Sequence, residues 1–371
     1  MTRPSLFLVG GARPNFMKVA PVYHALMRAG RFAVTLVHTG QHYDQALSDT
    51  FFREFDLPEP DIMLGVGSGT HGLQTARVLE RFEQSLIEHA PDMVIVVGDV
   101  NSTAACALAS AKMVYPDGRR PKLAHVEAGL RSFDRTMPEE INRLVTDALA
   151  DYLFTSEPSG ATNLLHEGVP KEKIFFVGNV MIDTLRVHVD RAVALKVWER
   201  FGLAPSSYGV VTLHRPVNVD DPAALAAMVD TLSQASERLP LVFPVHPRTL
   251  ARLRAMDAGG MRWGNRIHMV EPLGYRDFLS IMSRARIVLT DSGGVQEETT
   301  ALGIPCLTMR TSTERPVTVE QGTNQLVGPV RENVLAALDG IMAGATKAGA
   351  IPDLWDGHAA ERIAAALSQQ F

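Results

Sequence analysis

Short apolar runs alternate with helical patterns along the whole chain, and this alternation restricts the fold more than any other feature. The runs are apolar at successive positions, so both faces of each predicted strand are buried, as in parallel strands covered by helices on both sides. We predict ten strands: Leu6–Val9, Ala33–His38, Met93–Val97, Leu123–Val126, Tyr152–Thr155, Gly209–Leu213, Leu241–Phe243, Arg266–Val270, Ile287–Thr290 and Cys306–Met309. The sequence therefore predicts an α/β protein built on parallel sheets.

Ten strands exceed one ordinary doubly wound sheet, so we expect two such domains, residues 1–178 and 179–354, joined near Gly178. The last helical pattern, Ala359–Gln369, lies within residues 355–371 and is expected to pack back on the first domain. The other helical patterns that separate the strands include Pro14–Arg28, Leu73–His89, Ser102–Met113, Ala223–Arg238 and Val295–Leu302.

Composition limits the kind of protein. The chain has 371 residues, a formal net charge of −5 and two cysteines, Cys106 and Cys306. This charge gives no general basic face for nucleic acid. Apolar runs are shorter than the roughly 18 to 20 residues needed to cross a bilayer. We therefore expect a cytoplasmic protein without a disulfide framework, and neither nucleic acid nor membrane as a partner.

A phosphate-binding turn is predicted after the strand Ile287–Thr290. The strand runs into Ser292, Gly293 and Gly294, and a helix follows at once. Glycines allow close backbone approach, and the first helical turn offers unpaired N–H groups, which together bind phosphate. Glu298 lies one turn into the same helix, where a carboxylate can accept hydrogen bonds from ribose hydroxyls. The alternative interpretation is a plain strand–turn–helix in which Ser292 caps the helix.

Acidic and basic residues follow the predicted strands of the first domain. Asp99 and Glu127 come directly after two strands, and Glu139 stands at the start of a helix. Carboxyl ends of parallel strands meet at one edge, so we expect these three acids to face one crevice. Arg13 and Lys18 flank the N-terminus of the first helix and could neutralise a diphosphate. Each carboxylate alone also fits the structural role of a helix cap or a favourable charge in a first helical turn.

The second domain offers partners for a nucleotide. His214 and Arg215 end one strand, His246 follows the next, and Arg315 comes after the last strand. A nucleotide held by this domain would direct its sugar at the acids of the first domain.

Seven ordered blocks resemble the non-hydrolysing UDP-N-acetylglucosamine 2-epimerase family, and they extend from Gly11 to Gly328. The blocks are GARPNFMKVAP, VGDVNST, HVEAGLRSFDRTMPEEINR, VGNVMID, TLHRP, PVHP and TDSGGVQEETTALGIPCLTMRTSTERP. The resemblance implies two Rossmann-like domains facing across a cleft, as in GT-B glycosyltransferases, in a homodimer. It also implies interconversion of UDP-GlcNAc and UDP-ManNAc for the synthesis of cell-surface polysaccharide.

The resemblance also assigns roles to single residues. The family's three essential carboxylates match Asp99, Glu127 and Glu139, and its active-site histidine matches His214. The basic residues of its first loop match Arg13 and Lys18, and the arginine after its PEE motif matches Arg143. Its phosphate-binding turn matches Ser292, Gly293 and Gly294. Its ribose carboxylate matches Glu298, and the arginine of its ERP motif matches Arg315. Phe278 stands where the family has an aromatic residue near the uracil. Four further residues fall near the positions with which the family binds a second, allosteric molecule of UDP-GlcNAc: Gln41, His42, Arg77 and His246.

One segment departs from the family. The family often continues His-Arg with Arg-Glu, whereas His214-Arg215 is followed here by Pro216, Val217 and Asn218. This departure leaves open the contacts of that loop and the substituents of the sugar.

The hydrogen on C2 of an N-acetylhexosamine has no adjacent carbonyl group to make it acidic, so direct removal of this proton would be too slow. Two routes to inversion at C2 remain: transient oxidation of the neighbouring carbon by a bound nicotinamide, or expulsion of the C1 substituent. The first predicted strand ends in GGARPN rather than GxGxxG, so no dinucleotide cofactor is expected. Arg13, His214, Arg215 and Arg315, with the glycine turn, can stabilise a leaving UDP. The carboxylates can move the protons, so we predict elimination to a 2-acetamidoglucal followed by re-addition.

No metal site is expected, because the histidines lie on separate loops without the spacing of zinc ligands. Four alternatives stay open within this fold: a hydrolysing epimerase, a 2-epimerase of a modified UDP-GlcNAc derivative, a GT-B glycosyltransferase and a non-catalytic UDP-sugar sensor. Fold resemblance alone does not separate them. The sequence also leaves open which carboxylate is the base and which the acid.

Overall fold

The computed structural model describes residues 3–11, 13–41, 52–257 and 264–371. The chain divides into two compact units. Unit 1 comprises residues 1–184 and 353–371, and unit 2 comprises residues 185–352. The division falls inside helix α7 (Val180–Ala194).

Unit 1 contains a parallel sheet of seven strands in its described part, in the order β3-β2-β1-β4-β5-β6-β7. The strand order reverses direction next to β1, which is the doubly wound arrangement. The strands are β1 (Ser5–Gly10), β2 (Ala33–His38), β3 (Ile62–Met63), β4 (Met93–Val97), β5 (Lys122–Val126), β6 (Tyr152–Thr155) and β7 (Ile174–Phe176).

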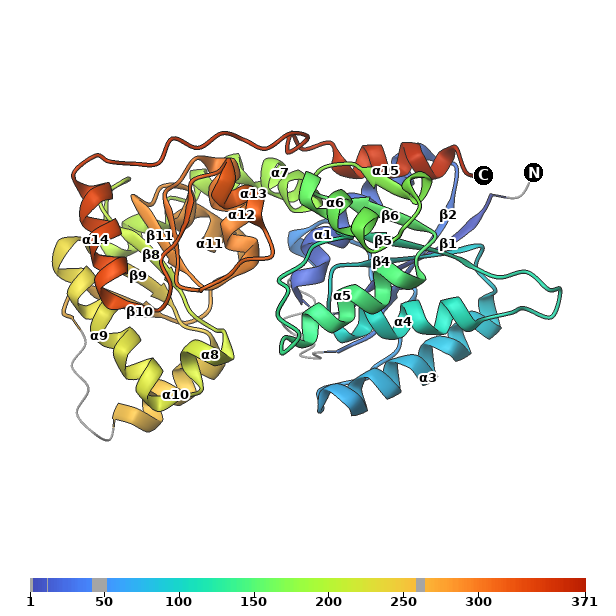
Figure 1. Cartoon of the computed structure of the whole chain (residues 1–371), viewed down its shortest axis with the longest axis horizontal. Coiled ribbons are helices and arrows are strands. Elements are labelled where there is room, and N and C mark those ends of the chain that lie inside the picture. Colours follow the sequence, from blue (N-terminus) through green and yellow to red (C-terminus); the bar gives the residue numbers. More distant parts are fainter. Residues whose placement is uncertain (1–2, 12, 42–51, 258–263) are drawn as a thin grey trace. The chain divides into compact units, whose positions relative to one another are not determined.

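Helices cover both faces of this sheet (Figure 1). Helices α3, α4 and α5 pack against one another on one face, and α1 and α15 pack together on the other. The helices are α1 (Arg13–Ala29), α3 (His71–His89), α4 (Asn101–Lys112), α5 (Pro138–Leu149), α6 (Pro158–His166) and α15 (Ala359–Ser368), with the short helix η1 (Lys171–Lys173). The core between α3, α4 and the sheet is built from fully buried side chains such as Phe82, Val94, Val96 and Leu153.

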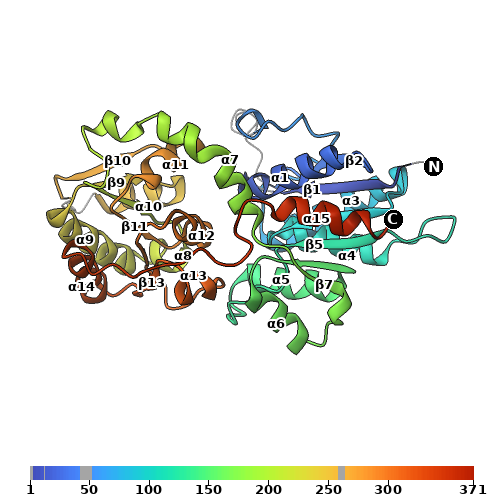
Figure 2. The ribbon, with the colours of Figure 1, turned by 90° about the horizontal axis from the view of Figure 1, so that it is seen from above.

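The C-terminal segment belongs to unit 1. Helix α15 lies along α1 (Figure 2). Asp183 accepts hydrogen bonds from the backbone N–H groups of Ala359 and Ala360, at 3.1 and 2.7 Å. The indole N–H of Trp355 donates to the carbonyl oxygen of Ser156 at 2.9 Å. These contacts satisfy the first N–H groups of α15 and attach the end of the chain to the first sheet.

Unit 2 contains a second parallel sheet, with six strands among the residues described, in the order β10-β9-β8-β11-β12-β13. The strands are β8 (Gly209–Thr212), β9 (Leu241–Pro244), β10 (Ile267–Val270), β11 (Ile287–Thr290), β12 (Cys306–Thr308) and β13 (Asn324–Leu326). The helices are α8 (Pro216–Val219), α9 (Pro222–Arg238), α10 (Pro247–Asp257), α11 (Tyr275–Ser283), α12 (Gly293–Leu302), α13 (Pro316–Glu320) and α14 (Arg331–Met342), with η2 (Val197–Phe201). Helices α9 and α14 pack side by side, and α11 packs against α12.

The predicted α/β class with two parallel sheets is confirmed, and all ten predicted strands are present. Three strands escaped prediction: β3, β7 and β13. All three are edge strands of two or three residues, which bury too little side chain to leave an apolar run in the sequence. Cys106 and Cys306 are free and buried. In the described part of the chain, no helix combines the length and the apolar character needed to span a membrane.

Candidate active site

Two of the predicted carboxylates follow neighbouring strands of unit 1. Val97 at the end of β4 pairs with Val126 at the end of β5. Glu127 comes directly after Val126, and Asp99 follows Val97 after one glycine. Glu127 is buried and has φ +75°, in the left-handed region that side chains other than glycine rarely adopt. Such backbone strain costs about 1–3 kcal/mol and is concentrated at functional sites. The end of β5 therefore holds a strained, buried acid.

Lys18 on α1 is the ionic partner of Glu127. Gly98, with φ +70°, lies beneath this pair: a Cβ atom there would approach Oε2 of Glu127 to 3.4 Å and Nζ of Lys18 to 3.5 Å. Glycine is favoured at position 98 because its φ lies in the left-handed region, and a larger side chain there would lie in contact with both charged groups. The structure thus brings Lys18 to a carboxylate of unit 1.

Asp99 is bound to helix α5. Arg143, which is 1% exposed, forms an ion pair with Asp99 and a second one with Glu140 at 2.6 Å. Glu140 also accepts hydrogen bonds from the backbone N–H groups of Ser132 and Phe133. Burial alone would raise the pKa of Glu140, but these bonds and Arg143 hold it below its ordinary value. Glu140 is therefore an ionised anchor that orients Arg143 toward Asp99.

Glu139 differs from its neighbour Glu140. Pro138 is the first residue of α5 and Glu139 the second, and the Glu139 side chain is only partly buried. Among the residues that the structure describes, Glu139 forms no hydrogen bond or ion pair. The sequence predicted Glu139 as a site residue and gave Glu140 no role, although both fit the negative first turn of a helix. Only the packing distinguishes the anchor from the less constrained acid.

In unit 2, Asp291 organises the predicted His214-Arg215 turn. Its carboxylate lies 3.0 Å from Nδ1 of His214 and accepts from the backbone N–H groups of His214 and Arg215. The Asn218 amide donates to the same carboxylate at 3.1 Å and to the carbonyl oxygen of Met309 at 3.3 Å. Pro216 begins α8, where its missing N–H costs nothing. The segment that departs from the family thus provides a buried amide that supports Asp291.

Helix α12 begins at the predicted phosphate turn. Ser292 is its N-cap residue but forms no side-chain cap hydrogen bond within the described chain. Its backbone N–H donates instead to Oγ1 of Thr290 at 2.9 Å. The interpretation of Ser292 as a simple helix cap is therefore wrong. The first N–H groups of this ten-residue helix remain uncapped by that side chain, as an anion site requires.

A buried charge cluster lies behind this turn. Glu314 contacts Arg215, Arg310 and Arg315 at 3.4, 2.9 and 3.0 Å, and Arg315 also donates to Glu297 at 3.0 Å. Burial would raise the pKa of Glu314, but the three arginines hold it well below its ordinary value. Three guanidinium groups and two carboxylates leave one net positive charge.

Two donors of this cluster have no partner: Nε of Arg215 and Nη1 of Arg310 are buried without a hydrogen bond among the described atoms. Unsatisfied buried N–H groups are costly. Both arginines pair with Glu314, which lies against Gly293 at the start of α12, so these donors favour an anionic ligand near that end of the helix. A Cβ atom on Gly293 would lie 2.8 Å from Oε1 of Glu314, which explains the glycine at the first helical position.

Glu298 is buried one turn into α12 and accepts a hydrogen bond from the hydroxyl of Tyr275 at 2.9 Å. Burial raises its pKa to about 7; the Tyr275 hydrogen bond lowers it and Glu297 raises it further. The carboxyl group therefore changes its charge near neutral pH, which suits a group that exchanges a proton or a hydroxyl partner when a ligand binds.

A cavity of about 250 Å³ opens beside the phosphate turn. Its walls bring together the predicted residues His214, His246, Phe278 and Ser292. The rings of His214 and His246 lie 6.2 Å apart. His246, which the sequence grouped with the allosteric residues, thus lines the same cavity as the predicted uracil and phosphate residues. The cavity is mostly apolar with few polar groups, as nucleobase sites are.

The remaining predicted residues lie elsewhere. Gln41 is buried, and its side chain accepts from the hydroxyl and the N–H of Ser102 at the start of α4. Arg77 lies partly buried on α3. His42 is outside the described residues, as is the side chain of Arg13. The two described positions both belong to unit 1, whereas His246 belongs to unit 2.

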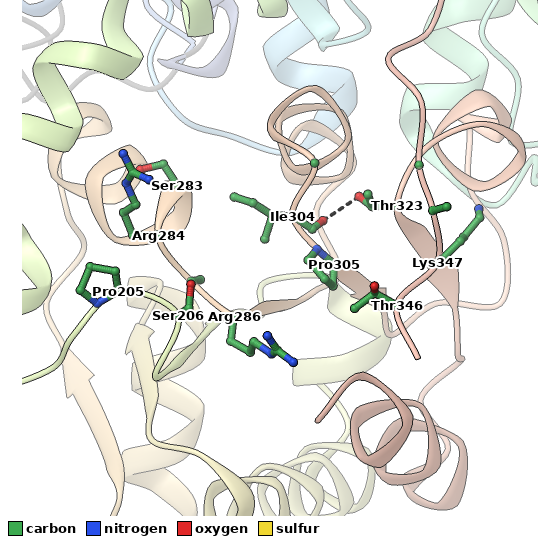
Figure 3. Close-up of a pocket in the computed structure, with 14 residues that line it drawn as sticks. Pro205, Ser206, Ser283, Arg284, Arg286, Ile304, Pro305, Thr323, Thr346 and Lys347 are labelled. Carbon is green, nitrogen blue, oxygen red and sulfur yellow. Dashed lines mark hydrogen bonds between the residues drawn. The ribbon is translucent and has the colours of Figure 1, made fainter. Parts of the chain in front are cut away.

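A larger cavity of about 490 Å³ lies at the opposite, amino ends of β11 and β12 (Figure 3). It contains none of the predicted site residues. Its polar groups are largely bound within the chain: Thr323 donates to the carbonyl oxygen of Ile304 at 2.6 Å, and Lys347 donates to Val319 and Asn324. Ligands of parallel sheets bind at the carboxyl ends of strands, so the smaller cavity is the better candidate. Nowhere in the described chain do three His, Cys, Asp or Glu side chains form a metal-binding group.

Sequence reasoning missed the residues that hold the site in place: Glu140, Asp291, Asn218, Tyr275, Arg310 and Glu314. Asp291 and Glu314 stand inside the quoted motifs, so their position was a usable signal. Asn218 and Tyr275 carry no such signal, because their partners are remote in the chain.

Comparison with known proteins gives matches to UDP-sugar 2-epimerases over most of the chain. A family model described as UDP-N-acetylglucosamine 2-epimerase matches residues 24–368. The chain is 39% identical over 340 residues to the UDP-N-acetylglucosamine 2-epimerase of Methanocaldococcus jannaschii, covering 90% of this chain and 91% of that protein. It is also 39% identical over 329 residues to the UDP-2,3-diacetamido-2,3-dideoxy-D-glucuronate 2-epimerase of Pseudomonas aeruginosa, covering 88% of each.

Solved structures give the same result. The crystal structure of the M. jannaschii enzyme in complex with UDP-GlcNAc and UDP matches with a TM-score of 0.89 at 39% identity, covering 98% of this chain and 99% of that one. The Neisseria meningitidis enzyme bound to UDP-GlcNAc matches with a TM-score of 0.86 at 26% identity, covering 98% of this chain and 100% of that one. With its two doubly wound sheets and its predicted motifs in order, this chain belongs to the UDP-N-acetylglucosamine 2-epimerase family of isomerases.

Proposed function

We propose that the chain is a non-hydrolysing UDP-N-acetylglucosamine 2-epimerase, which interconverts UDP-GlcNAc and UDP-ManNAc in the cytoplasm for cell-surface polysaccharide synthesis. The observation that carries the proposal is the uncapped start of α12 beside unsatisfied donors of Arg215 and Arg310. That arrangement suits a diphosphate that gains charge as it leaves. Family membership and the UDP-GlcNAc bound to a relative of 39% identity support the same substrate class.

The proposed reaction has two balanced steps. In the first, a carboxylate removes the C2 proton while the bond between C1 and the diphosphate oxygen breaks, leaving UDP and 2-acetamidoglucal. In the second, the diphosphate oxygen attacks C1 while an acid delivers a proton to the opposite face of C2. No net water is consumed, so the reaction is an isomerisation.

We assign UDP to unit 2 and proton transfer to unit 1. In unit 2 the base and the ribose contact the cavity of Phe278 and the carboxyl group of Glu298, and the diphosphate takes the start of α12. In unit 1 the proton-transfer groups are Asp99, Glu127 and Glu139. Asp99 and Glu127 are each held in place by a cation, Arg143 and Lys18 respectively.

Isotope exchange tests the mechanism. Enzyme is incubated with UDP-GlcNAc in D₂O and the products are followed by NMR. Elimination places deuterium at C2 of both epimers, while internal hydride return retains the original hydrogen. Equal amounts of free ManNAc and UDP would instead identify a hydrolysing epimerase, and sugar transfer that requires an acceptor would identify a glycosyltransferase.

A second candidate substrate is a modified sugar nucleotide. The Pseudomonas aeruginosa relative, named for UDP-2,3-diacetamido-2,3-dideoxy-D-glucuronate, is as similar in identity as the M. jannaschii enzyme. Both substrates carry UDP at C1 and an acetamido group at C2, so elimination serves either one. Parallel measurement of kcat/KM on the two nucleotides decides between them.

The proposal includes a homodimer and an activating second molecule of UDP-GlcNAc. If the activator is required, the reverse reaction with UDP-ManNAc alone begins with a lag, and a trace of UDP-GlcNAc removes the lag. Linear progress from the first turnover would exclude that part of the proposal. Sedimentation at working concentrations tests the dimer separately.

A further inference from the structure

His125 is fully buried at the end of β5, and both nitrogens of its imidazole face oxygen atoms. Nδ1 lies 2.6 Å from Oδ1 of Asp147, and Nε2 lies 2.8 Å from the carbonyl oxygen of Gly98. A carbonyl oxygen only accepts, and a neutral imidazole carries only one N–H. The two contacts therefore require either a doubly protonated imidazole or a protonated Asp147.

The surroundings of Asp147 favour its ionised form. Oδ2 accepts from the backbone N–H of Gly129 at 3.0 Å and lies 2.7 Å from Nη1 of Arg131. Burial alone would raise the pKa of Asp147, and the ion pair with Arg131 opposes this effect whatever the charge on His125. An ionised carboxylate offers only acceptors, so both nitrogens of His125 must donate.

The charge balance of the cluster leads to the same protonation state. Arg131 lies between Asp147 and Glu167, at 2.7 and 2.6 Å. With a protonated His125, the cluster holds two positive and two negative charges. With a neutral His125, a net negative charge would remain in a region where three of these side chains are almost completely buried. Uncompensated buried charge is strongly unfavourable.

The turn held by His125 carries Asp99. Gly98 has a left-handed backbone, its N–H donates to the carbonyl oxygen of Val126 at 3.0 Å, and its own carbonyl oxygen accepts from His125. The turn is thus fixed to β5 from both sides. The same glycine lies against the Lys18–Glu127 pair. A hydrogen bond from a cation is shorter and stronger than a neutral one, so it fixes the turn more tightly.

We propose that His125 is a permanently protonated positioning residue, which holds the Gly98–Asp99 turn in place for the proton transfer assigned to Asp99. The positioning role of His125 in proton transfer rests on the proposed epimerase reaction. The protonation state of His125 does not depend on that reaction, because it is a property of the protein without substrate.

Nitrogen NMR tests the protonation state in the intact wild-type enzyme labelled with ¹⁵N-histidine. The His125 signal is assigned by its loss in His125→Gln. His38 is a matched internal standard: it is 1% exposed, and its Nδ1 accepts from the backbone N–H of Gly40 at 2.8 Å, so it is neutral. We expect protons on both ring nitrogens of His125 at neutral pH. An unprotonated His125 nitrogen at neutral pH overturns the proposal.

Kinetics test the positioning role. The amide of His125→Gln can still donate to Gly98 but carries no charge. We expect kcat to fall by about 10- to 100-fold, the effect of a small misplacement of a reacting group, with KM and UDP affinity changed less than about threefold. Asp147→Asn is expected to lower kcat similarly. In the double variant the two amides can bond to each other, so thermal stability recovers relative to the single variants while kcat stays low.

The possible failures are distinguishable. Recovery of kcat together with stability in the double variant, or a His125→Gln rate within threefold of wild type, overturns the positioning role. An inactive wild-type enzyme whose His125 is doubly protonated would overturn the proposed function and leave the protonation state established. Should His125→Gln fail to fold, Asp147→Asn gives both the kinetic comparison and the NMR assignment, because losing the charged partner at 2.6 Å shifts the His125 signal.

Discussion

The carboxylate of Asp291 binds His214 twice, through Nδ1 at 3.0 Å and through the backbone N–H at 3.1 Å. This arrangement assigns the proton of a neutral His214 ring to Nδ1 and leaves Nε2 as the nitrogen available to a ligand. Asp291 is fully buried, whereas 40% of the His214 side chain is exposed. The aspartate therefore orients a histidine that lines the cavity beside the start of α12.

Asp291→Asn is expected to disturb this turn, because the amide places N–H donors against the donors of His214, Arg215 and Asn218. We expect UDP affinity to fall about 10- to 100-fold and the free energy of unfolding to fall by about 1–3 kcal/mol, because buried donors lose a charged acceptor. Titration calorimetry and urea unfolding measure the two. The control is Asp220→Asn, whose surface pairs with Arg248 and Arg252 contribute at most about 1 kcal/mol.

Glu139 and Glu140 are adjacent acids whose substitution we expect to affect stability differently. Glu139→Gln should lower kcat by about 10²- to 10⁴-fold, the range for a general acid or base, with unchanged stability. Glu140→Gln should lower stability as well, because Arg143 and two backbone N–H groups lose a charged partner. Rates and thermal melts of both variants check this. Equal melting losses in the two would contradict the assignment of Glu140 as the anchor.

We expect the same kinetic effect from substitution of the two ion-paired acids of unit 1, Asp99 and Glu127. Asp99→Asn and Glu127→Gln should each reduce kcat by about 10²- to 10⁴-fold while UDP affinity is retained, because UDP is assigned to unit 2. A near-normal rate for Glu127→Gln would remove it from the proton-transfer set.

Ser292→Ala separates ligand binding from helix capping. The Ser292 side chain forms no cap bond, so we expect no loss of stability and a several-fold loss of UDP affinity, about 0.5–1.5 kcal/mol for one hydrogen bond. Asp221 is the matched control, because its carboxylate caps α9 by accepting from Ala223 at 3.2 Å. Asp221→Ala should lose about 1 kcal/mol of stability and no UDP affinity. A stability loss in Ser292→Ala would restore the capping role.

Glu298 should make stability depend on pH. Its pKa is raised from 4.5 to about 7, mainly by burial. A raised pKa means that the folded state binds the proton more tightly, so this contribution is complete below pH 4.5 and is lost as the pH rises to about 7. The loss is about 3 kcal/mol. Urea unfolding of the wild type and of Glu298→Gln at both ends of this pH range measures the loss. If the difference in unfolding free energy between the two proteins is the same at both pH values, the raised pKa of Glu298 is contradicted.

Arg315 should control the fate of the intermediate. Its guanidinium lies against Gly293 at the start of α12 and is bound by Glu297 and Glu314. Guanidinium groups hold phosphate oxygens in pairs, so we expect Arg315→Ala to slow epimerisation and to raise the share of released UDP and 2-acetamidoglucal. Anion-exchange chromatography and NMR quantify both. Arg13→Ala is expected to act in the same direction. Unchanged partition in both variants would exclude this clamp.

The order of secondary structure and the position of the turn at Ser292 were readable from the sequence, because they depend on local patterns. Apolar runs, glycines and the residue after each strand are all set within a few positions, and the carboxyl ends of parallel strands necessarily share an edge. Asp99 and Glu127 could be placed together for that reason. The short edge strands β3, β7 and β13 were not readable, because they bury too few side chains.

The partners of the site residues depend on contacts between distant parts of the chain. Lys18 and Glu127 are 109 residues apart, Asp99 and Arg143 are 44 apart, and no local pattern pairs them. Burial then gave adjacent residues different roles: Glu140 became an anchor and Glu139 remained accessible. Local sequence sets the backbone that presents a side chain, whereas its charge state and its partner follow from desolvation and packing, which exist only once the chain has folded.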